Sequence, residues 1–179
     1  MQSGKTLIEL LIALSIFAIL FTGVVPSAQS LYTQHRITAE LNLISSYVQL
    51  ARIDAIEQHR SVLLCPSPDF KRCEFSDWSL PKMLFFDRNL NNVRDNEEAI
   101  YFAGEPLSGS LLIKGPKKAV RFYEDGTIAS TATLTVCDKN NDPRYSKAVF
   151  ISLQGRIRLS QDINKDGKHQ KTNGTNLFC

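Results

Sequence analysis

The sequence has little net charge and few of the motifs that enzymes use. Its 21 lysines and arginines are nearly balanced by 18 acidic residues, which leaves a formal charge of +3, so any affinity for a polyanion must come from a local cluster. It has no phosphate-binding glycine loop, no nucleophile elbow and no histidine pair at metal-ligand spacing. Its histidines, His35, His59 and His169, lie in polar helix or loop contexts. These absences argue against an enzyme and against a resident cofactor.

The four cysteines lack the spacing of a metal site, because none is in a CxxC pair or near a histidine at zinc-ligand spacing. In an exported segment, disulfides are the usual role of such residues. Of the three possible pairings, the simplest joins Cys65 to Cys73 and Cys137 to Cys179, and the sequence alone leaves the choice open. The second bridge would tether the end of the sequence and add roughly 3 to 4 kcal/mol of stability.

One long apolar run occupies residues 7 to 25, and the remaining sequence shows no internal repeat and no second domain. At 1.5 Å per residue, its about 19 residues make a helix of roughly 29 Å, which matches the hydrocarbon core of one bilayer. Glu9 is its single carboxylate, and burial in lipid without a partner would cost on the order of 1 to 3 kcal/mol. An ordinary secretory signal has a basic start and a shorter apolar core without acids. A plain membrane anchor is the alternative, but it gives no reason for Glu9.

Downstream of Pro26 the hydrophobic pattern predicts first a helix and then strands. Apolar residues recur at helical spacings of four and three, at Ile37, Leu41, Ile44, Val48, Ala51 and Ala55. Gly23 and Pro26 predict a loosened helix before this stretch. Apolar segments after Arg60 predict strands at residues 61–64, 82–86, 99–102, 110–113, 120–123, 132–136, 148–153 and 156–159. The expected fold class is α+β, one long helix followed by an antiparallel sheet domain.

The start of the chain resembles the prepilin cleavage motif. Residues 4–12, GKTLIELLI, match a glycine followed by x-T-L-I-E-L-L. The resemblance implies that a prepilin peptidase cuts after Gly4 on the cytoplasmic side and that Lys5 becomes the first, methylated residue of the mature chain. It also implies that Glu9 pairs with the N-terminal amine of a neighbouring subunit, since a buried carboxylate is tolerated beside an opposite charge.

Later segments resemble the FimT minor pilins and their relative, pseudopilin H (GspH) of type II secretion. They read ARIDAIEQ, FFDRNLNNVRDNEE, VRFYEDGTI and SLQGRIRLS. The resemblance implies the type IV pilin fold, a long N-terminal helix packed on a two-sheet antiparallel head. It divides the chain into a leader (1–4), a transmembrane and filament-core helix (5–30) and a periplasmic or extracellular head (31–179). The implied location is the inner membrane, with a single pass, and then a type IV pilus on the cell surface beside other major and minor pilins.

The sharpest local signal is the segment from Gly155 to Arg158, GRIR, which follows one apolar strand through a tight turn and opens another. Side chains alternate along a strand, so Arg156 and Arg158 share one face about 6.6 Å apart while Ile157 and Leu159 point to the core. Two guanidinium groups so placed can each hold a phosphate with bidentate hydrogen bonds.

The Gly-Arg-x-Arg pattern resembles the DNA-binding motif of FimT-like pilins that serve DNA uptake in natural transformation. The resemblance implies double-stranded DNA as a partner, with Arg156 and Arg158 as phosphate contacts and Gly155 as the turn. The alternative is that two arginines on the wet face of an edge strand keep it soluble and unpaired.

Two further groups of basic residues could widen this patch. They are Lys165, Lys168, His169 and Lys171 downstream, and Lys114, Lys117, Lys118 and Arg121 on another loop. A bridge from Cys137 to Cys179 would hold the downstream group near the GRIR strand, which favours Lys165, Lys168 and Lys171 as DNA contacts. Charge runs are also common in solvated loops that bind nothing. Two to four neutralised phosphates would give a slope of log affinity against log salt of about −2 to −4.

Residues 87–98 partly match a calcium-binding loop. Oxygen-bearing side chains occupy positions 1, 3, 5, 9 and 12, at Asp87, Asn89, Asn91, Asp95 and Glu98. The turn glycine of such loops is absent, and residues 162–167 carry only half of the pattern. Asp and Asn also favour turns without a metal. The main expectation is therefore no metal, with calcium as the alternative.

The sequence leaves two functions of different class. The first is a minor pilin that binds extracellular double-stranded DNA without sequence preference, for uptake by a competent cell. The second is a structural minor pilin or pseudopilin that primes assembly of a type IV pilus or a type II secretion pseudopilus and does not bind DNA.

Overall fold

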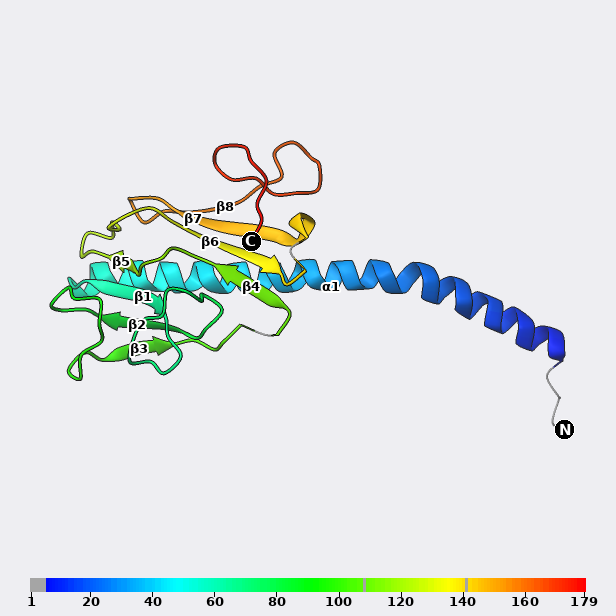
Figure 1. Ribbon diagram of the computed structural model, residues 1–179, viewed down its shortest axis with the longest axis horizontal. Helices are drawn as coiled ribbons and strands as arrows, with labels where there is room; N and C mark the ends of the chain where they lie inside the picture. Colours follow the sequence, from blue (N-terminus) through cyan, green and yellow to red (C-terminus); the bar gives the residue numbers. More distant parts are fainter. Residues whose placement is uncertain (1–5, 108, 141) are drawn as a thin grey trace. The chain divides into compact units, whose positions relative to one another are not determined.

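The computed structural model describes residues 6–107, 109–140 and 142–179 (Figure 1). The predicted leader and cleavage site, Gly4 and Lys5, lie outside these ranges. The chain divides into two units, the first ending at Arg36 and the second comprising Ile37–Cys179. One helix, α1 (Leu7–Gln58), runs through both units, and the strands belong to the second.

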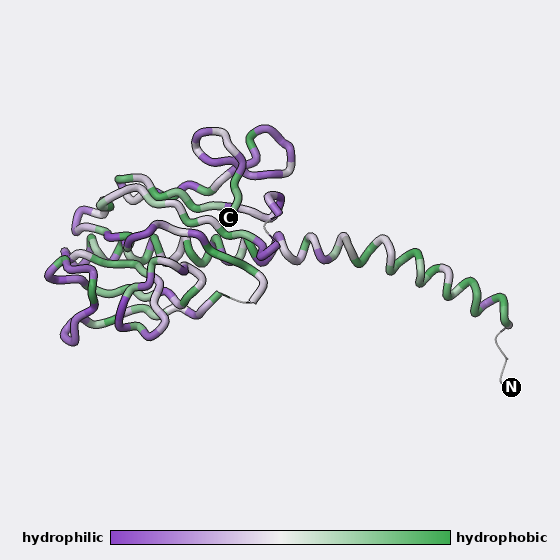
Figure 2. Tube along the Cα trace, viewed as in Figure 1, coloured by the Kyte–Doolittle hydropathy of each residue, from purple (hydrophilic) through white to green (hydrophobic). Residues whose placement is uncertain are grey.

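The first part of α1 begins with a capping box and is apolar on all sides. The Glu9 N–H donates to Thr6 Oγ1 (3.4 Å), and the Thr6 N–H donates to Glu9 Oε2 (2.9 Å). An 18-residue window of the helix has a mean hydropathy of 2.5, enough by length and composition to cross a membrane. Its apolar side chains are exposed, Leu7 by 78% and Ile19 by 71%, and Figure 2 shows this part in green. Such a surface requires lipid or other subunits as its partner.

Gly23 and Pro26 do not loosen the helix, so that prediction was wrong. The helix continues through both residues. Proline at position 26 removes the N–H that would bond the Thr22 carbonyl, but a long apolar helix tolerates the loss of one such bond. The next carbonyl along the helix, that of Gly23, accepts from Ser27 Oγ at 3.2 Å.

The second unit contains two antiparallel sheets of four strands each. Sheet A has the order β3-β2-β1-β5 and comprises β1 (Val62–Pro66), β2 (Lys82–Phe86), β3 (Ile100–Ala103) and β5 (Val120–Phe122). Sheet B has the order β4-β6-β7-β8 and comprises β4 (Leu111–Lys114), β6 (Ala132–Asp138), β7 (Ser146–Ile151) and β8 (Ile157–Leu159). A short 3-10 helix, η1 (Pro143–Tyr145), precedes β7. Each strand overlaps one of the predicted segments, which confirms the α+β expectation.

The main core lies between the second part of α1 and the inner faces of both sheets. The predicted helical stripe is buried, with Ile37, Val48, Ala51 and Ala55 fully covered. Sheet A is buried on its outer face as well, where a second cluster consists of Leu63, Cys65, Met83 and Phe85. Because β1 and β2 are covered on both faces, their sequences are apolar without alternation, apart from Lys82 at the start of β2.

Both disulfides of the simplest pairing are present in the structure. Cys65–Cys73 closes a short loop beside the outer face of sheet A, and Cys137–Cys179 joins β6 to the segment after β8. Cys179 Sγ also lies 3.9 Å from the carbonyl oxygen of Thr135. Residues 160–179 are therefore held on the outer face of sheet B, where the red end of the chain is seen in Figure 1.

Candidate nucleic-acid interface

The turn that leads into β8 depends on Gly155. The Gly155 N–H donates to the Ser152 carbonyl (2.8 Å), and the Ser152 N–H donates to the Arg156 carbonyl (3.0 Å). Gly155 has a φ of +69°, in the left-handed region that other residues rarely adopt. A Cβ atom at this position would also collide with the carbonyl oxygen of Gly126. The GRIR segment therefore needs its glycine for the bend and for close packing on the 123–127 turn.

The register of β8 turns its two arginines away from the core. Ile157 pairs with Ile151 and packs against the main core, and Arg158 pairs with Phe150 on the opposite face of sheet B. Arg156 precedes the strand by one residue, and both arginines are exposed. They thus present their guanidinium groups on the outer face of sheet B.

Leu159 does not point into the core, contrary to the prediction. Its side chain is 44% exposed, and the core cluster includes Ile157 but not Leu159. The reason is that β8 is the edge strand of sheet B, and the core ends before its last residue.

The Arg158 guanidinium is positioned by neutral groups. It lies over the ring of Phe150, with Cζ 5.6 Å from the ring centroid, and Nη2 donates to Thr172 Oγ1 at 3.3 Å. Among the described residues, neither Arg156 nor Arg158 is in an ion pair. Both positive charges are therefore available to an anionic ligand.

Both arginines line one open groove of about 710 Å³ on sheet B. The groove also contains the aromatic ring of Phe150 and the hydroxyl groups of Thr133 and Thr172. Arg156 borders a second depression of about 490 Å³ together with Arg52 of α1. The basic surface therefore continues from sheet B toward the helix.

The 160–179 segment contributes Lys171 to this surface. Lys171 lies with its Nζ 4.8 Å from the ring centroid of Phe178. A depression of about 440 Å³ contains both of these side chains and shares Phe150 and Thr172 with the groove of the arginines. Lysine and arginine thus meet on one continuous surface.

Lys165 and Lys168 are not among the described residues that line either depression. They belong to a separate turn at residues 162–168, where Asp162 Oδ2 accepts the Gly167 N–H and Asp166 Oδ1 accepts the Lys168 N–H. The disulfide therefore holds the segment in place without bringing all of its lysines to the arginines.

His169 adds no charge to the surface at neutral pH. Burial lowers the pKa of its imidazole, while a hydrogen bond from Nδ1–H to the Ser160 carbonyl oxygen (2.8 Å) partly opposes this effect. The neutral ring instead links the segment to the end of β8.

Arg121 is not a nucleic-acid contact, contrary to its grouping with Lys114, Lys117 and Lys118. It is 7% exposed, and its Nη2 donates to Asp87 Oδ2 at 2.6 Å. In the register of β1 and β5 it lies opposite Leu63, on the outer face of sheet A. Of the three lysines, Lys114 is the one that lines the depression with Lys171.

The carboxylates of the 87–98 loop accept hydrogen bonds from N–H groups of the same loop. Glu98 Oε1 and Oε2 accept from the backbone N–H groups of Arg88 (2.7 Å) and Asp95 (3.0 Å). The side-chain amides of Asn89 and Asn91 both donate to Asp95 Oδ2. The oxygens that a calcium ion would need are therefore engaged within the loop, and no group of three or more acidic, histidine or cysteine ligands occurs in the described part of the chain.

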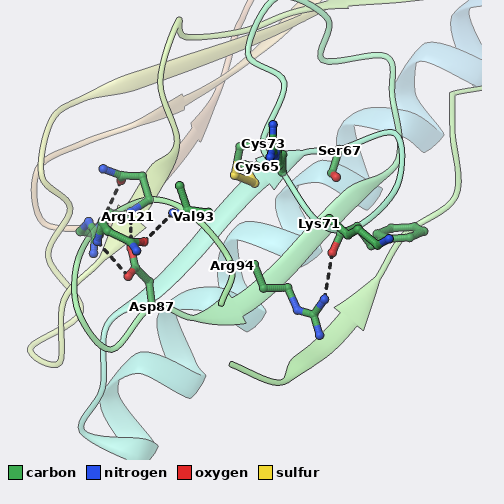
Figure 3. The surroundings of a disulfide bond; sticks show 12 residues. Cys65, Ser67, Lys71, Cys73, Asp87, Val93, Arg94 and Arg121 are labelled. Atoms are coloured by element: carbon green, nitrogen blue, oxygen red, sulfur yellow. Dashed lines mark hydrogen bonds and ion pairs between the residues drawn. A yellow bond between two sulfur atoms is a disulfide. The ribbon is translucent and has the colours of Figure 1, made fainter. Parts of the chain in front are cut away.

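Arg121 stands beside Asp87, where the calcium-loop pattern suggested a metal ion. Figure 3 shows its guanidinium between the loop and the strand, with dashed lines to its partners. Arg94, which belongs to the 87–98 loop itself, donates to the Phe70 carbonyl within the Cys65–Cys73 loop at 3.3 Å. Arginine side chains, through these hydrogen bonds, thus hold together the loops on this face of sheet A.

Three features of the molecule were not predicted from the sequence: the capping box and two aromatic rings of the basic surface. The Thr6–Glu9 capping box was readable as T-x-x-E before an apolar run. The sequence did not indicate that Phe150 and Phe178 lie beside Arg158 and Lys171. These contacts depend on the strand register and on the fold of the 160–179 segment.

A capped apolar helix followed by a head of two antiparallel sheets is the architecture of type IV pilin-like subunits. The family profile described as "Type II transport protein GspH" matches residues 40–155, and a prokaryotic N-terminal methylation motif matches residues 1–25. The chain belongs to the GspH family.

Solved structures support the same fold. The type IV minor pilin FimU of Pseudomonas aeruginosa is 18% identical with a TM-score of 0.59, over 76% of this chain and 94% of that chain. The minor pseudopilin EpsH from the type 2 secretion system of Vibrio cholerae is 12% identical with a TM-score of 0.51, over 69% and 95%. No curated protein sequence matches this chain. At these identities the likeness shows the fold alone.

These findings confirm the minor pilin or pseudopilin assignment and the pilin fold. The methylation motif and the apolar helix fit an inner-membrane anchor that carries a soluble head. In such a subunit the expected partners are other pilins and the prepilin peptidase.

Proposed function

We propose that the protein is a minor pilin that binds double-stranded DNA without sequence preference, for DNA uptake in natural transformation. The observation that carries the proposal is the pair Arg156 and Arg158, exposed on one groove and not ion-paired within the described chain. Phosphate recognition favours arginine, whose planar fork matches two phosphate oxygens.

The contacts around Arg158 favour binding further. The Phe150 ring and the Thr172 hydroxyl restrict the guanidinium without neutralising it, so less side-chain entropy is lost when a phosphate binds. Lys171 supplies a further charge on the connected depression. Two to four phosphate contacts correspond to a slope of about −2 to −4 in log affinity against log salt.

The test is fluorescence anisotropy of a labelled random duplex with the full chain in non-ionic detergent, over a range of salt concentrations. Arg156→Gln/Arg158→Gln should weaken binding roughly tenfold and reduce the magnitude of the salt slope by about 2. The matched control is Arg60→Gln/Arg88→Gln, which removes two exposed arginines elsewhere on the head and should change both values little. Equal losses in the two variants, or no binding by the wild type, would reject the proposal.

A structural role without DNA is the second candidate. It is favoured by the exposed apolar face of the first unit and by the likeness to EpsH, a subunit of a secretion system. A chain that supports filament assembly equally well with and without Arg156 and Arg158, and that binds no duplex, would establish this role instead.

A further inference from the structure

The depression beside the arginine groove contains two lysines that come from separate elements. Lys114 is the last residue of β4, and Lys171 belongs to the 160–179 segment. The two positions are 57 residues apart in the chain (171 − 114), so the sequence gives no reason to pair them. The depression itself is about 440 Å³ and opens onto the groove through Phe150, Thr133 and Thr172.

Both ammonium groups are held in place by the same chain segment. Lys171 Nζ lies 4.8 Å from the ring centroid of Phe178, and Lys114 Nζ donates to the carbonyl oxygen of Cys179 at 3.2 Å. Cys179 is fixed to β6 by its disulfide with Cys137. The segment therefore orients a pair of cations that would otherwise be mobile side chains.

The register of sheet B gives the distance between Lys114 and Arg158 across the sheet. Lys114 pairs with Thr135 across β4 and β6, Thr135 pairs with Ala148 of β7, and β8 with Arg158 is the next strand. Three strand spacings amount to about 14 Å. The register gives this separation for Lys114 and Arg158 alone, because Lys171 adjoins Thr172, the hydrogen-bond partner of Arg158. The major groove of B-DNA is about 12 Å wide, so Arg158 and Lys114 can reach phosphates on its two sides.

We infer that Lys114 and Lys171 form a second phosphate-binding subsite, distinct from Arg156 and Arg158, and that the Cys137–Cys179 disulfide keeps this subsite assembled. The inference rests on the proposed DNA binding and extends it: one head contacts both phosphate rows that flank a major groove of a duplex. The positioning residue for Lys171 is Phe178, whose ring centroid lies 4.8 Å from the lysine Nζ but which touches no phosphate itself.

The test uses the full chain in non-ionic detergent with the same random duplex and salt series. Lys114→Gln/Lys171→Gln should reduce the magnitude of the salt slope by about 2 and weaken binding roughly tenfold. The matched control, Lys165→Gln/Lys168→Gln, removes two lysines of the same segment region that lie off the groove and should leave the slope unchanged. Equal slopes for wild type and Lys114→Gln/Lys171→Gln, or equal losses in the control, would overturn the inference.

Failure of the inference is distinguishable from failure of the proposed function. If Arg156→Gln/Arg158→Gln lowers affinity and the lysine pair does not, the second subsite is rejected and DNA binding stands. If the wild type does not bind the duplex, both are rejected.

A second experiment tests the role of the Cys137–Cys179 disulfide. Cys137→Ser/Cys179→Ser should reproduce the slope of Lys114→Gln/Lys171→Gln, provided that Trp78 fluorescence shows a folded head. A wild-type slope in the folded disulfide variant would reject the role of the bridge.

Discussion

The outer faces of sheets A and B both carry arginine, in opposite surroundings. On sheet A, Arg121 is 7% exposed and ion-paired with Asp87. On sheet B, Arg158 is exposed, lies over Phe150 and has no carboxylate partner in the described chain. The same side chain therefore supports the fold on one face and is available to a ligand on the other.

The difference shows what decides the role of a strand arginine. A buried guanidinium must be paired, because an unpaired buried charge is strongly unfavourable. An exposed guanidinium costs little without a partner, so beside an aromatic ring and away from acidic side chains it keeps a charge that a ligand can use. The nearest acidic side chain, and not the residue type, separates the two cases.

The largest expected effect concerns the buried pair on sheet A. Arg121→Met should lower the free energy of unfolding by about 3 to 5 kcal/mol, because Asp87 then lies buried without its partner. The exposed pair Arg144–Asp142 has the same 2.6 Å separation, and Arg144→Met should cost less than about 1 kcal/mol. Urea unfolding followed by the fluorescence of buried Trp78 measures both, and equal losses would show that burial does not distinguish the two pairs.

The two disulfides should also differ between the sheets. Cys137–Cys179 spans 42 residues and Cys65–Cys73 spans 8. Loop entropy then predicts that replacing the pairs with serine costs about 4 kcal/mol on sheet B and about 2.5 kcal/mol on sheet A. Unfolding under urea of the two double variants decides this, and a larger loss from the short loop would contradict the entropic explanation.

A smaller effect is expected at the turn before β8. Gly155→Ala should destabilise the head by about 1 to 3 kcal/mol, since the residue has a positive φ and its Cβ would strike the Gly126 carbonyl. Gly174 also has a positive φ but has open space around it, so Gly174→Ala should cost only about 1 kcal/mol. Thermal unfolding of both variants, with duplex binding measured in parallel, should show DNA affinity reduced for Gly155→Ala alone. Similar melting points for the two would argue against the close approach to Gly126.

The smallest effect is expected from acid on the segment of sheet B. The pKa of His169 is lowered by burial, so the unfolded chain binds a proton more readily than the folded one. The stability that the neutral ring confers is full above pH 6.5 and is lost as the pH falls through the folded pKa. The protection factors of the 160–179 amides, which are exchange rates corrected for the intrinsic pH dependence, should therefore fall below pH 6.5 more in the wild type than in His169→Gln. An identical pH dependence in both would remove His169 as the cause.

Much of the fold could be predicted from the sequence, because the spacing of apolar residues along the chain follows which side chains are buried. The stripe from Ile37 to Ala55 and all the strands follow from which positions are apolar. The continuous helix through Pro26 was not predicted, because proline is expected to loosen a helix by removing one backbone donor, and this helix tolerates the loss.

The site could be predicted only in part. The GRIR segment was readable because glycine, turn and alternation are local properties. The exclusion of Arg121 was not, since it depends on Asp87, which is distant in the chain and adjacent in space. The contribution of Lys114 likewise depends on the sheet register and on a disulfide that brings Cys179 to β6.

The most direct test follows the arginine side chains themselves. In NMR spectra of the full chain in detergent micelles, the Nε–H signals of Arg156 and Arg158 should shift and saturate as duplex DNA is added, while those of Arg121 and Arg144 stay in place. Duplex binding that leaves the Arg156 and Arg158 signals unmoved, or that moves the Arg121 signal instead, would contradict the division of roles between the two sheets.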